Sequence, residues 1–190
     1  MKIHILGPSG SGTSTLGETI SKKYNFPWFD SDNFFWEQTD PPFLKKRIKK
    51  DRVQFLKREL NKNDSWVLSG SIIGWGDFIK KRLDLVIYLY IEPAIRIHRL
   101  IDRERVRYGN RIDPGNDMYK IHIEFIEWAR NYERDNMNMR SRKSENEWMK
   151  DLKCKIIKIE EEMSLQKEME IVSKEINLLL IKKRQKIIKI

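Results

Sequence analysis

Cysteine and long apolar runs are both scarce in this chain of 190 residues. The one cysteine, Cys154, excludes a disulfide within the chain and favours a reducing compartment. The apolar run LVIYLYI has seven residues, whereas a membrane-spanning helix needs about 20. The N-terminal MKIHIL lacks the small-residue cleavage site of a signal peptide. We therefore expect a cytoplasmic protein that does not enter a membrane.

Acidic residues are outnumbered, because Lys and Arg total 38 against 28 Asp and Glu, for a net charge of +10. The excess fits either a phosphate-bearing or nucleic-acid partner, or lysine-rich helix faces in solvent. Acidic residues interrupt most basic stretches except the tail 181–190, IKKRQKIIKI. That tail is either a frayed helix end or a weak polyanion-binding patch. No nucleic-acid-reading module is recognisable, which disfavours nucleic acid as a partner.

Glycine is also scarce, yet three of the nine glycines fall in GPSGSGTST, residues 7–15. Gly7 and Gly12 have the spacing of a phosphate-binding P-loop, G-x-x-x-x-G-K-[ST], and Ser14 occupies its hydroxyl position. In such a loop the backbone N–H groups and the following helix N-terminus bind phosphate oxygens. The predicted nucleotide-binding residues are Gly7, Ser9, Gly10, Ser11, Gly12, Thr13, Ser14 and Thr15.

The P-loop lysine is missing, because Thr13 stands in its place. Threonine cannot supply the charge that lysine brings to the β- and γ-phosphates. The loop is therefore either a nucleotide site that takes its cation from elsewhere, or a glycine-rich turn without a ligand. We expect the cation to come from the arginine-rich segment 103–118, with Arg103 and Arg111 as first candidates.

Strand and helix patterns alternate along the chain, which predicts an α/β fold with a parallel sheet. We expect strands within 2–6, 27–32, 65–70, 84–91 and 154–159. Helices are expected after the glycine loop, over 44–60 with Leu44, Ile48, Leu56 and Leu60 in a buried stripe, from Pro93, and over 118–133. The closing helix places Leu165, Met169, Val172 and Ile176 on one face. Segments 103–118 and 134–146 are predicted as a mobile loop and a polar connection.

Five stretches, ILGPSGSGTSTLG, FDSDNFFW, DPPF, VLSGSIIGWGD and YGNRIDPGNDMY, resemble the P-loop nucleoside monophosphate kinase-like superfamily, which includes adenylate, shikimate and gluconate kinases. They are most similar to a bacterial group filed as adenylate kinase-related or AAA-type ATPases, in which threonine also replaces the lysine. The resemblance covers about residues 1–160. It implies a P-loop NTPase three-layer sandwich: a five-stranded parallel sheet with helices on both faces and an Arg-rich lid at 103–118. One domain, 1–180, would contain acceptor-side helices at 33–62 and precede the tail 181–190.

The resemblance also implies roles for single residues, with ATP and Mg²⁺ as cofactors. WFDSD is similar to the acidic motif of shikimate-type kinases, so Asp30 would hold Mg²⁺ through water, with Ser14 on the metal. Asp32 would orient or deprotonate an acceptor hydroxyl; the alternative is that Asp30, Ser31 or Asp32 caps the next helix. RLIDR resembles the R-L-x-x-R of nucleotide kinases, which would put Arg99 over the adenine and Arg103 near the phosphates.

Departures from the family patterns leave the acceptor open. The third strand ends in LSGS and not in the triple glycine of shikimate kinases, and the DSD acids are not those of adenylate kinases. Asp32, Phe35 and Ser71 are the candidate acceptor-binding residues. The aromatics Trp28, Phe34, Phe35 and Trp36 form either a pocket wall or part of the core. The sequence predicts an ATP-dependent kinase of a small molecule or nucleotide, acting by in-line transfer; the alternative is a nucleotide-binding protein or slow NTPase switch.

Overall fold

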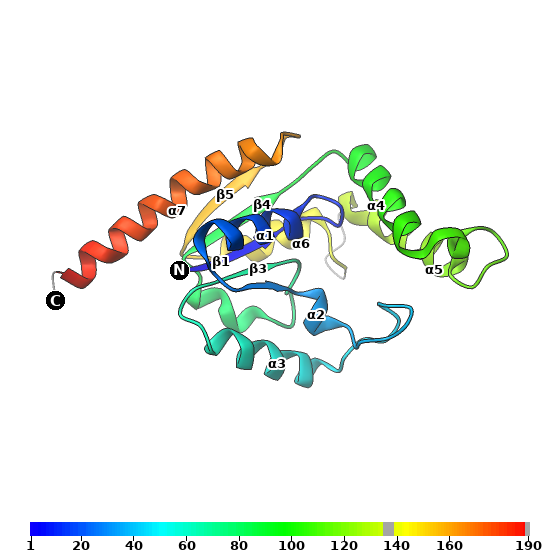
Figure 1. The fold of residues 1–190 in the computed structure, drawn as a ribbon, viewed down its shortest axis with the longest axis horizontal. Coiled ribbons are helices and arrows are strands. Elements are labelled where there is room, and N and C mark those ends of the chain that lie inside the picture. Colours follow the sequence, from blue (N-terminus) through cyan, green and yellow to red (C-terminus); the bar gives the residue numbers. More distant parts are fainter. Residues whose placement is uncertain (135–138, 189–190) are drawn as a thin grey trace.

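The computed structural model describes residues 1–134 and 139–188, which fold around one five-stranded sheet. All strands are parallel, in the order β2-β3-β1-β4-β5. The predicted five-stranded parallel α/β fold is confirmed (Figure 1). The strands are β1 (Lys2–Leu6), β2 (Trp28–Asp30), β3 (Trp66–Ser69), β4 (Leu85–Leu89) and β5 (Lys155–Ile159).

Helices cover both faces of the sheet, because its central strands are apolar on both sides. In β1, Ile3 and Ile5 pack into one core cluster and Leu6 into the other. The first cluster is completed by α1 (Thr13–Tyr24) and α7 (Leu165–Ile188). The second is completed by α2 (Asp32–Phe35), α3 (Lys49–Asn61), the 3-10 helix η1 (Asp77–Arg82) and α6 (Arg142–Lys150).

A helical hairpin extends from the sheet after β4 (Figure 1). It consists of α4 (Pro93–Tyr108), the 3-10 helix η2 (Gly109–Ile112) and α5 (Tyr119–Arg130), followed by η3 (Asn131–Glu133). The two long helices pack through Ile97, Leu100, Ile126 and Ala129, and the tip is closed by Tyr108, Ile112 and Met118. The loop prediction for 103–118 is therefore wrong in its first third, because α4 continues to Tyr108, and the remainder packs on itself.

Three further predictions differ from the structure. Leu44 and Ile48 are exposed, 46% and 63%, because residues 35–37 pair with 45–47 in an extended bend and α3 begins only at Lys49. Leu165 is exposed where α7 begins, whereas Met169, Val172 and Ile176 are buried as expected. The polar connection 134–146 contains the start of α6; part of it, 135–138, lies outside the described residues.

The helix α6 begins at a capping box in which the Ser141 hydroxyl accepts from the Ser144 backbone N–H and the Ser144 hydroxyl from that of Ser141. Trp148 and Met149 bury its far end against the sheet. The helix α7 runs to Ile188, so the tail from 181 to 188 is helical and extends beyond the sheet in Figure 1. Among the described residues, no helix is long and apolar enough to span a bilayer.

Candidate active site

The glycine loop joins the end of β1 to the start of α1 and is pressed against neighbouring backbone. Gly10 has φ +86, and a Cβ at this position would lie 2.6 Å from the carbonyl oxygen of Arg96 in α4. A Cβ on Gly7 would lie 2.0 Å from the carbonyl oxygen of Leu89. A side chain at either position would collide with neighbouring backbone, so only glycine fits there. The strand, loop and helix therefore have the arrangement of a P-loop.

Several polar groups of the loop are left for a ligand. Gly12 precedes α1 with φ 98, and no side chain within the described part of the chain caps the first turn. Ser11 is buried, and its Oγ has no hydrogen-bond partner among the described residues. Ser14 and Thr15 are exposed at the helix N-terminus. The loop thus presents N–H and hydroxyl groups at the positive end of a helix dipole, where a phosphate binds favourably.

Ser14 and the acids of β2 meet beside the loop. The Ser14 Oγ donates to Asp30 Oδ2 at 2.6 Å, and the backbone N–H of Asp32 donates to Asp30 Oδ1 at 2.9 Å. Asp30 thus accepts from the first backbone N–H of α2, while the N-cap residue Ser31 makes no side-chain capping bond to a described residue. The hydroxyl and carboxylate oxygens fit Mg²⁺, which proteins usually bind through one or two carboxylates together with substrate phosphates.

Asp32 begins α2 and is open to solvent, but the protein around it excludes part of its water. This desolvation, and then the neighbouring charge of Asp30, raise the pKa of Asp32, while Arg140, Arg103 and Arg107 oppose the rise. A raised pKa makes the carboxylate a stronger proton acceptor. Asp32 is therefore a candidate proton acceptor beside the glycine loop.

Basic side chains of α4 face this acidic site. Desolvation and the charge of Arg107 lower the pKa of Arg103. The charges of Asp32 and Asp30 oppose this lowering, so the Arg103 guanidinium lies within electrostatic reach of both acids.

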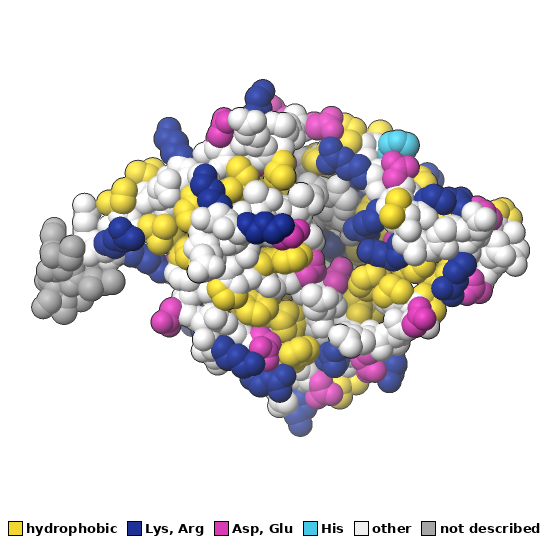
Figure 2. Space-filling model, viewed as in Figure 1, with side chains coloured by type: hydrophobic (Ala, Val, Ile, Leu, Met, Phe, Trp, Pro, Cys, Tyr) yellow, Lys and Arg dark blue, Asp and Glu magenta, His cyan; other side chains and the backbone are white. Residues whose placement is uncertain are grey.

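Arg99, in contrast, pairs with Glu162 at 2.8 Å, in the connection between β5 and α7. Figure 2 shows the surface hollowed between the sheet and the α4–α5 hairpin, with basic and acidic side chains around the hollow.

Arg111 lies in the tip of the hairpin. Its Nε and Nη2 donate to Asp117 at 3.1 and 2.5 Å, and its side chain is 44% exposed. Arg103 thus lies near the acids, whereas Arg111 is paired within the hairpin tip.

The aromatic residues of the acceptor side separate into two groups. Phe34 is buried in the core, and Trp28 packs against α1 and donates to Ser69 Oγ at 2.9 Å.

The second group surrounds Trp75. Phe35 meets Trp75 edge-on with ring centroids 6.2 Å apart. The guanidinium carbon of Arg52 lies 4.0 Å from the Phe35 centroid and 5.7 Å from that of Trp75, and Trp75 Nε1 donates to the carbonyl of Ser71 at 3.3 Å. Phe35 and Ser71 thus lie together, with Arg52 as a neighbour that the sequence patterns did not single out.

Arg140 is the second residue that sequence reasoning missed. It precedes α6, and its Nη2 donates to the carbonyl of Gly7 at the start of the glycine loop, while its Nε donates to Glu145 Oε1 at 2.9 Å. No local signal distinguishes Arg140 from the other arginines of a polar segment. Only the fold brings it to the loop.

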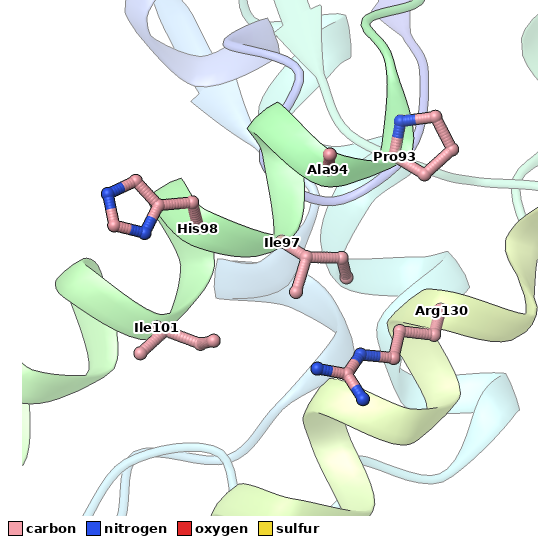
Figure 3. A pocket seen from close by; sticks show the side chains of 6 residues that line it. All are labelled: Pro93, Ala94, Ile97, His98, Ile101 and Arg130. Carbon is pink, nitrogen blue, oxygen red and sulfur yellow. The ribbon is translucent and has the colours of Figure 1, made fainter.

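A separate open groove lies between α4 and α5 (Figure 3). It contains none of the predicted site residues and is largely apolar, so it does not belong to the glycine-loop site. Its lining residues are Pro93, Ala94, Ile97, His98, Ile101 and Arg130.

Residues 3–120, more than half of the chain, match the family described as AAA domain. The chain belongs to this family. As an AAA domain protein with a glycine loop between β1 and α1, it is a member of the P-loop nucleoside monophosphate kinase-like superfamily, as its motifs indicated.

The AAA domain chain is similar to uncharacterized protein YqaC of Bacillus subtilis (strain 168), with 44% identity over 163 residues, 86% of this chain and 90% of that one. A cytidylate kinase of Archaeoglobus fulgidus is 27% identical over 115 residues, 55% of this chain and 62% of the kinase.

Two solved structures share the fold. A deoxyadenosine kinase from M. mycoides with bound dATP has a TM-score of 0.57 at 16% identity, covering 93% of this chain and all of that one, 100%. A shikimate kinase from Bacteroides thetaiotaomicron has a TM-score of 0.52 at 16% identity, with coverage of 91% and 98%. At this identity the two structures establish the P-loop kinase fold alone.

Proposed function

We propose that this protein is an ATP-dependent phosphotransferase whose acceptor carries a hydroxyl group. The observation that carries the proposal is the placement of Asp32 next to the Ser14–Asp30 hydrogen bond, at the mouth of the glycine loop. A phosphate acceptor is already ionised at neutral pH, whereas a hydroxyl acceptor must lose a proton. A carboxylate with a raised pKa at this point therefore favours a hydroxyl over a monophosphate.

The proposed step is an in-line displacement. The acceptor oxygen forms a bond to the γ-phosphorus of ATP as the bond from that phosphorus to the β,γ-bridging oxygen breaks. The bridging oxygen keeps the electron pair and leaves as part of ADP. The acceptor proton passes to Asp32 and then to solvent, so the products are ADP, the phosphorylated acceptor and one proton.

The remaining residues bind and position. The loop N–H groups and the hydroxyls of Ser9, Ser11 and Thr15 would bind the phosphates, and Arg99 would lie against the base. Arg103 would approach the transferring group, and Arg111 would join it on lid closure. Phe35 and Ser71 would contact the acceptor. Ser14 and Asp30 would hold Mg²⁺, which when bound neutralises phosphate charge.

The superfamily membership and the kinase relatives support phosphotransfer to a nucleotide or another small molecule; the choice of a hydroxyl acceptor rests on Asp32 alone. A nucleotide-binding protein or slow NTPase switch is the second candidate, and the observation that favours it is the missing lysine at Thr13. The single cysteine suits a reducing, cytoplasmic location for either activity.

An assay of ADP formation, with ATP, Mg²⁺ and a candidate acceptor present, distinguishes the kinase from the nucleotide-binding switch. Nucleosides, polyols and hydroxy acids form one panel of acceptors, and nucleoside monophosphates form the other. The proposal predicts that a member of the hydroxyl panel raises ADP release at least about 100-fold above hydrolysis by water. Stimulation by monophosphates alone would contradict the role of Asp32, and stimulation by no acceptor in either panel would favour the switch.

A further inference from the structure

The phosphate loop of this protein has no cation of its own, because Thr13 replaces the usual lysine. The loop N–H groups carry only partial charges, whereas the β- and γ-phosphates of ATP carry several full negative charges. Efficient transfer therefore requires a positive charge near the loop from another part of the chain. Arg103 is within electrostatic reach of the acids but makes no hydrogen bond or ion pair with the loop among the described residues, and Arg111 is paired with Asp117 in the hairpin tip.

Arg140 already contacts the loop. Its Nη2 donates to the Gly7 carbonyl, and its side chain is 19% exposed, so the guanidinium is largely enclosed beside the loop. Its charge also reaches Asp32, where it opposes the rise in pKa. Arg140 thus lies within electrostatic reach of both the phosphate loop and the proposed proton acceptor.

Two polar groups next to this contact have no partner in the described part of the chain. Arg140 uses Nη2 and Nε in hydrogen bonds, and its Nη1 makes none among the described residues. The Oγ of Ser11 is buried without a hydrogen bond from those residues, and a Cβ on Gly7 would lie 2.9 Å from it. A buried hydroxyl without a partner, and a guanidinium group with donors to spare beside it, are groups that a phosphate oxygen would bind.

A buried network holds Arg140 in position. Glu145 is fully buried; its Oε1 accepts from Arg140 Nε, and its Oε2 accepts from the Tyr132 hydroxyl at 2.5 Å. The Tyr132 hydroxyl lies 2.9 Å from that of Tyr88. Because Tyr132 gives its proton to Glu145, Tyr88 must be the donor in the second bond. Burial raises the pKa of both tyrosines, that of Tyr88 to about 12, so both stay protonated.

The buried carboxylate of Glu145 therefore takes its counter-charge from Arg140. A buried carboxylate without a paired cation is costly, and this cost holds the Arg140 side chain in one place. Such an arrangement is preorganised: it provides positive charge before the lid closes and needs no reorganisation during the reaction.

We propose that Arg140 supplies the fixed positive charge that the P-loop lysine supplies in other P-loop proteins, by binding the β- and γ-phosphates of ATP through the Nη1 donors, which no described residue occupies. This inference rests on the proposed ATP-dependent function. The Tyr88–Tyr132–Glu145 network positions the guanidinium and does not itself touch the nucleotide. A purely structural Arg140 would only attach α6 to the glycine loop.

The test removes the positive charge at Arg140 and then restores a positive charge at position 13, where P-loops usually carry lysine. Arg140→Met together with Glu145→Gln removes the cation without leaving a buried unpaired carboxylate. We expect this pair of changes to lower turnover at least about 100-fold and to weaken the binding of inorganic triphosphate at least about tenfold. Adding Thr13→Lys to the pair should recover about tenfold or more of both losses.

Three control variants distinguish the loss of the Arg140 charge from a loss of folded structure. Glu145→Gln alone keeps the guanidinium but removes the carboxylate that positions it, and should lose less triphosphate affinity than the paired variant. Arg142→Met removes an arginine that stacks on Tyr90 and pairs with Glu160, and should change neither measurement. Arg140→Lys keeps a charge at this position and should retain more binding than Arg140→Met; it serves as the test if the paired variant unfolds.

The outcomes distinguish the inference from the function on which it rests. Equal triphosphate binding by wild type and the Arg140→Met, Glu145→Gln variant would overturn the role of Arg140 and leave the kinase proposal standing. A loss that Thr13→Lys does not recover would assign Arg140 a structural role and would also overturn it. A wild type that binds neither triphosphate nor ATP would overturn both.

Discussion

Ser14 and Asp30 are joined by a hydrogen bond of 2.6 Å between Oγ and Oδ2. This bond connects the first turn of α1, which follows β1, to the end of β2; in the sheet, β1 and β2 are separated by one strand, β3. It gathers a hydroxyl and a carboxylate next to the phosphate loop. The pair is the candidate site at which Mg²⁺ and nucleotide phosphates would meet.

Removing the Ser14 hydroxyl should uncouple metal from nucleotide. The quantity to compare is the ratio of the affinity for an ATP analogue with Mg²⁺ to the affinity without it. We expect this ratio to be about tenfold smaller in Ser14→Ala than in wild type, because one oxygen ligand and the orientation of Asp30 are lost. Isothermal titration with and without Mg²⁺ measures the difference. Thr19→Ala, on the same helix with its hydroxyl bonded to the Thr15 carbonyl, is the matched control. Full Mg²⁺ enhancement in Ser14→Ala would remove Ser14 from the metal site.

Asp32→Asn should abolish proton acceptance but keep the shape of the site. We expect turnover to fall about 100-fold or more while the affinity for an ATP analogue changes little. Because the pKa of Asp32 is raised, the wild-type rate should increase with pH through a value above the ordinary 3.8 of aspartate. The variant should lack this rise, whereas Asp51→Asn, in the first turn of α3, should retain it. An unchanged rate profile in Asp32→Asn would exclude Asp32 as the base.

Gly10 and Gly115 have nearly the same backbone conformation, with φ +86 and +87, but different surroundings. A Cβ on Gly10 would meet the Arg96 carbonyl at 2.6 Å, whereas a Cβ on Gly115 would meet no atom within 4 Å among the described residues. Gly115→Ala should cost about 1 kcal/mol of strain, and Gly10→Ala about 2 kcal/mol more from overpacking. Thermal or denaturant unfolding gives both values. Equal losses would mean that the loop is not pressed against α4.

His4 should make the fold sensitive to mild acid. It is fully buried in β1, its Nδ1–H donates to the Leu68 carbonyl at 3.0 Å, and burial lowers its pKa from 6.5 to about 4. Unfolding exposes a histidine that binds a proton more tightly, so stability is lost as the pH falls from 6.5 toward 4. The loss amounts to about 3 kcal/mol at most.

Denaturant unfolding at several pH values checks this component. His4→Gln can keep a donor to Leu68 but does not titrate, so its stability should decrease less over the same range. His98→Gln changes an exposed imidazole on α4 and should behave as wild type. Identical acid sensitivity in His4→Gln and wild type would assign the effect to other groups.

Much of the fold was predictable because its signals are local. Each of the five strands is a short apolar or β-branched run, and the residues of the glycine loop follow one another in the chain. The start of α3 was mistaken because Leu44 and Ile48 continue a helical spacing, while pairing of residues 35–37 with 45–47 holds that segment extended. The helix α6 was missed because its apolar residues, Trp148 and Met149, are confined to its last turn.

The site was predictable only where its residues belong to a motif. Ser14, Asp30 and Asp32 could be assigned from their neighbours in sequence. Arg140 and Arg52 could not, because each reaches the site through packing of a distant segment, α6 in one case and α3 in the other. The contact between Arg140 and Gly7 spans 133 positions of the chain. A contact over this separation produces no periodicity or motif spacing in the sequence from which it could be predicted.

Binding of a non-hydrolysable ATP analogue to the whole protein, measured by isothermal titration with and without Mg²⁺, tests the central claim most directly. A working P-loop with Thr13 in place of lysine predicts micromolar affinity, strengthened by Mg²⁺ through Ser14 and Asp30. Absence of binding to the analogue under both conditions would show that the loop holds no nucleotide, and the proposed kinase activity would be contradicted with it.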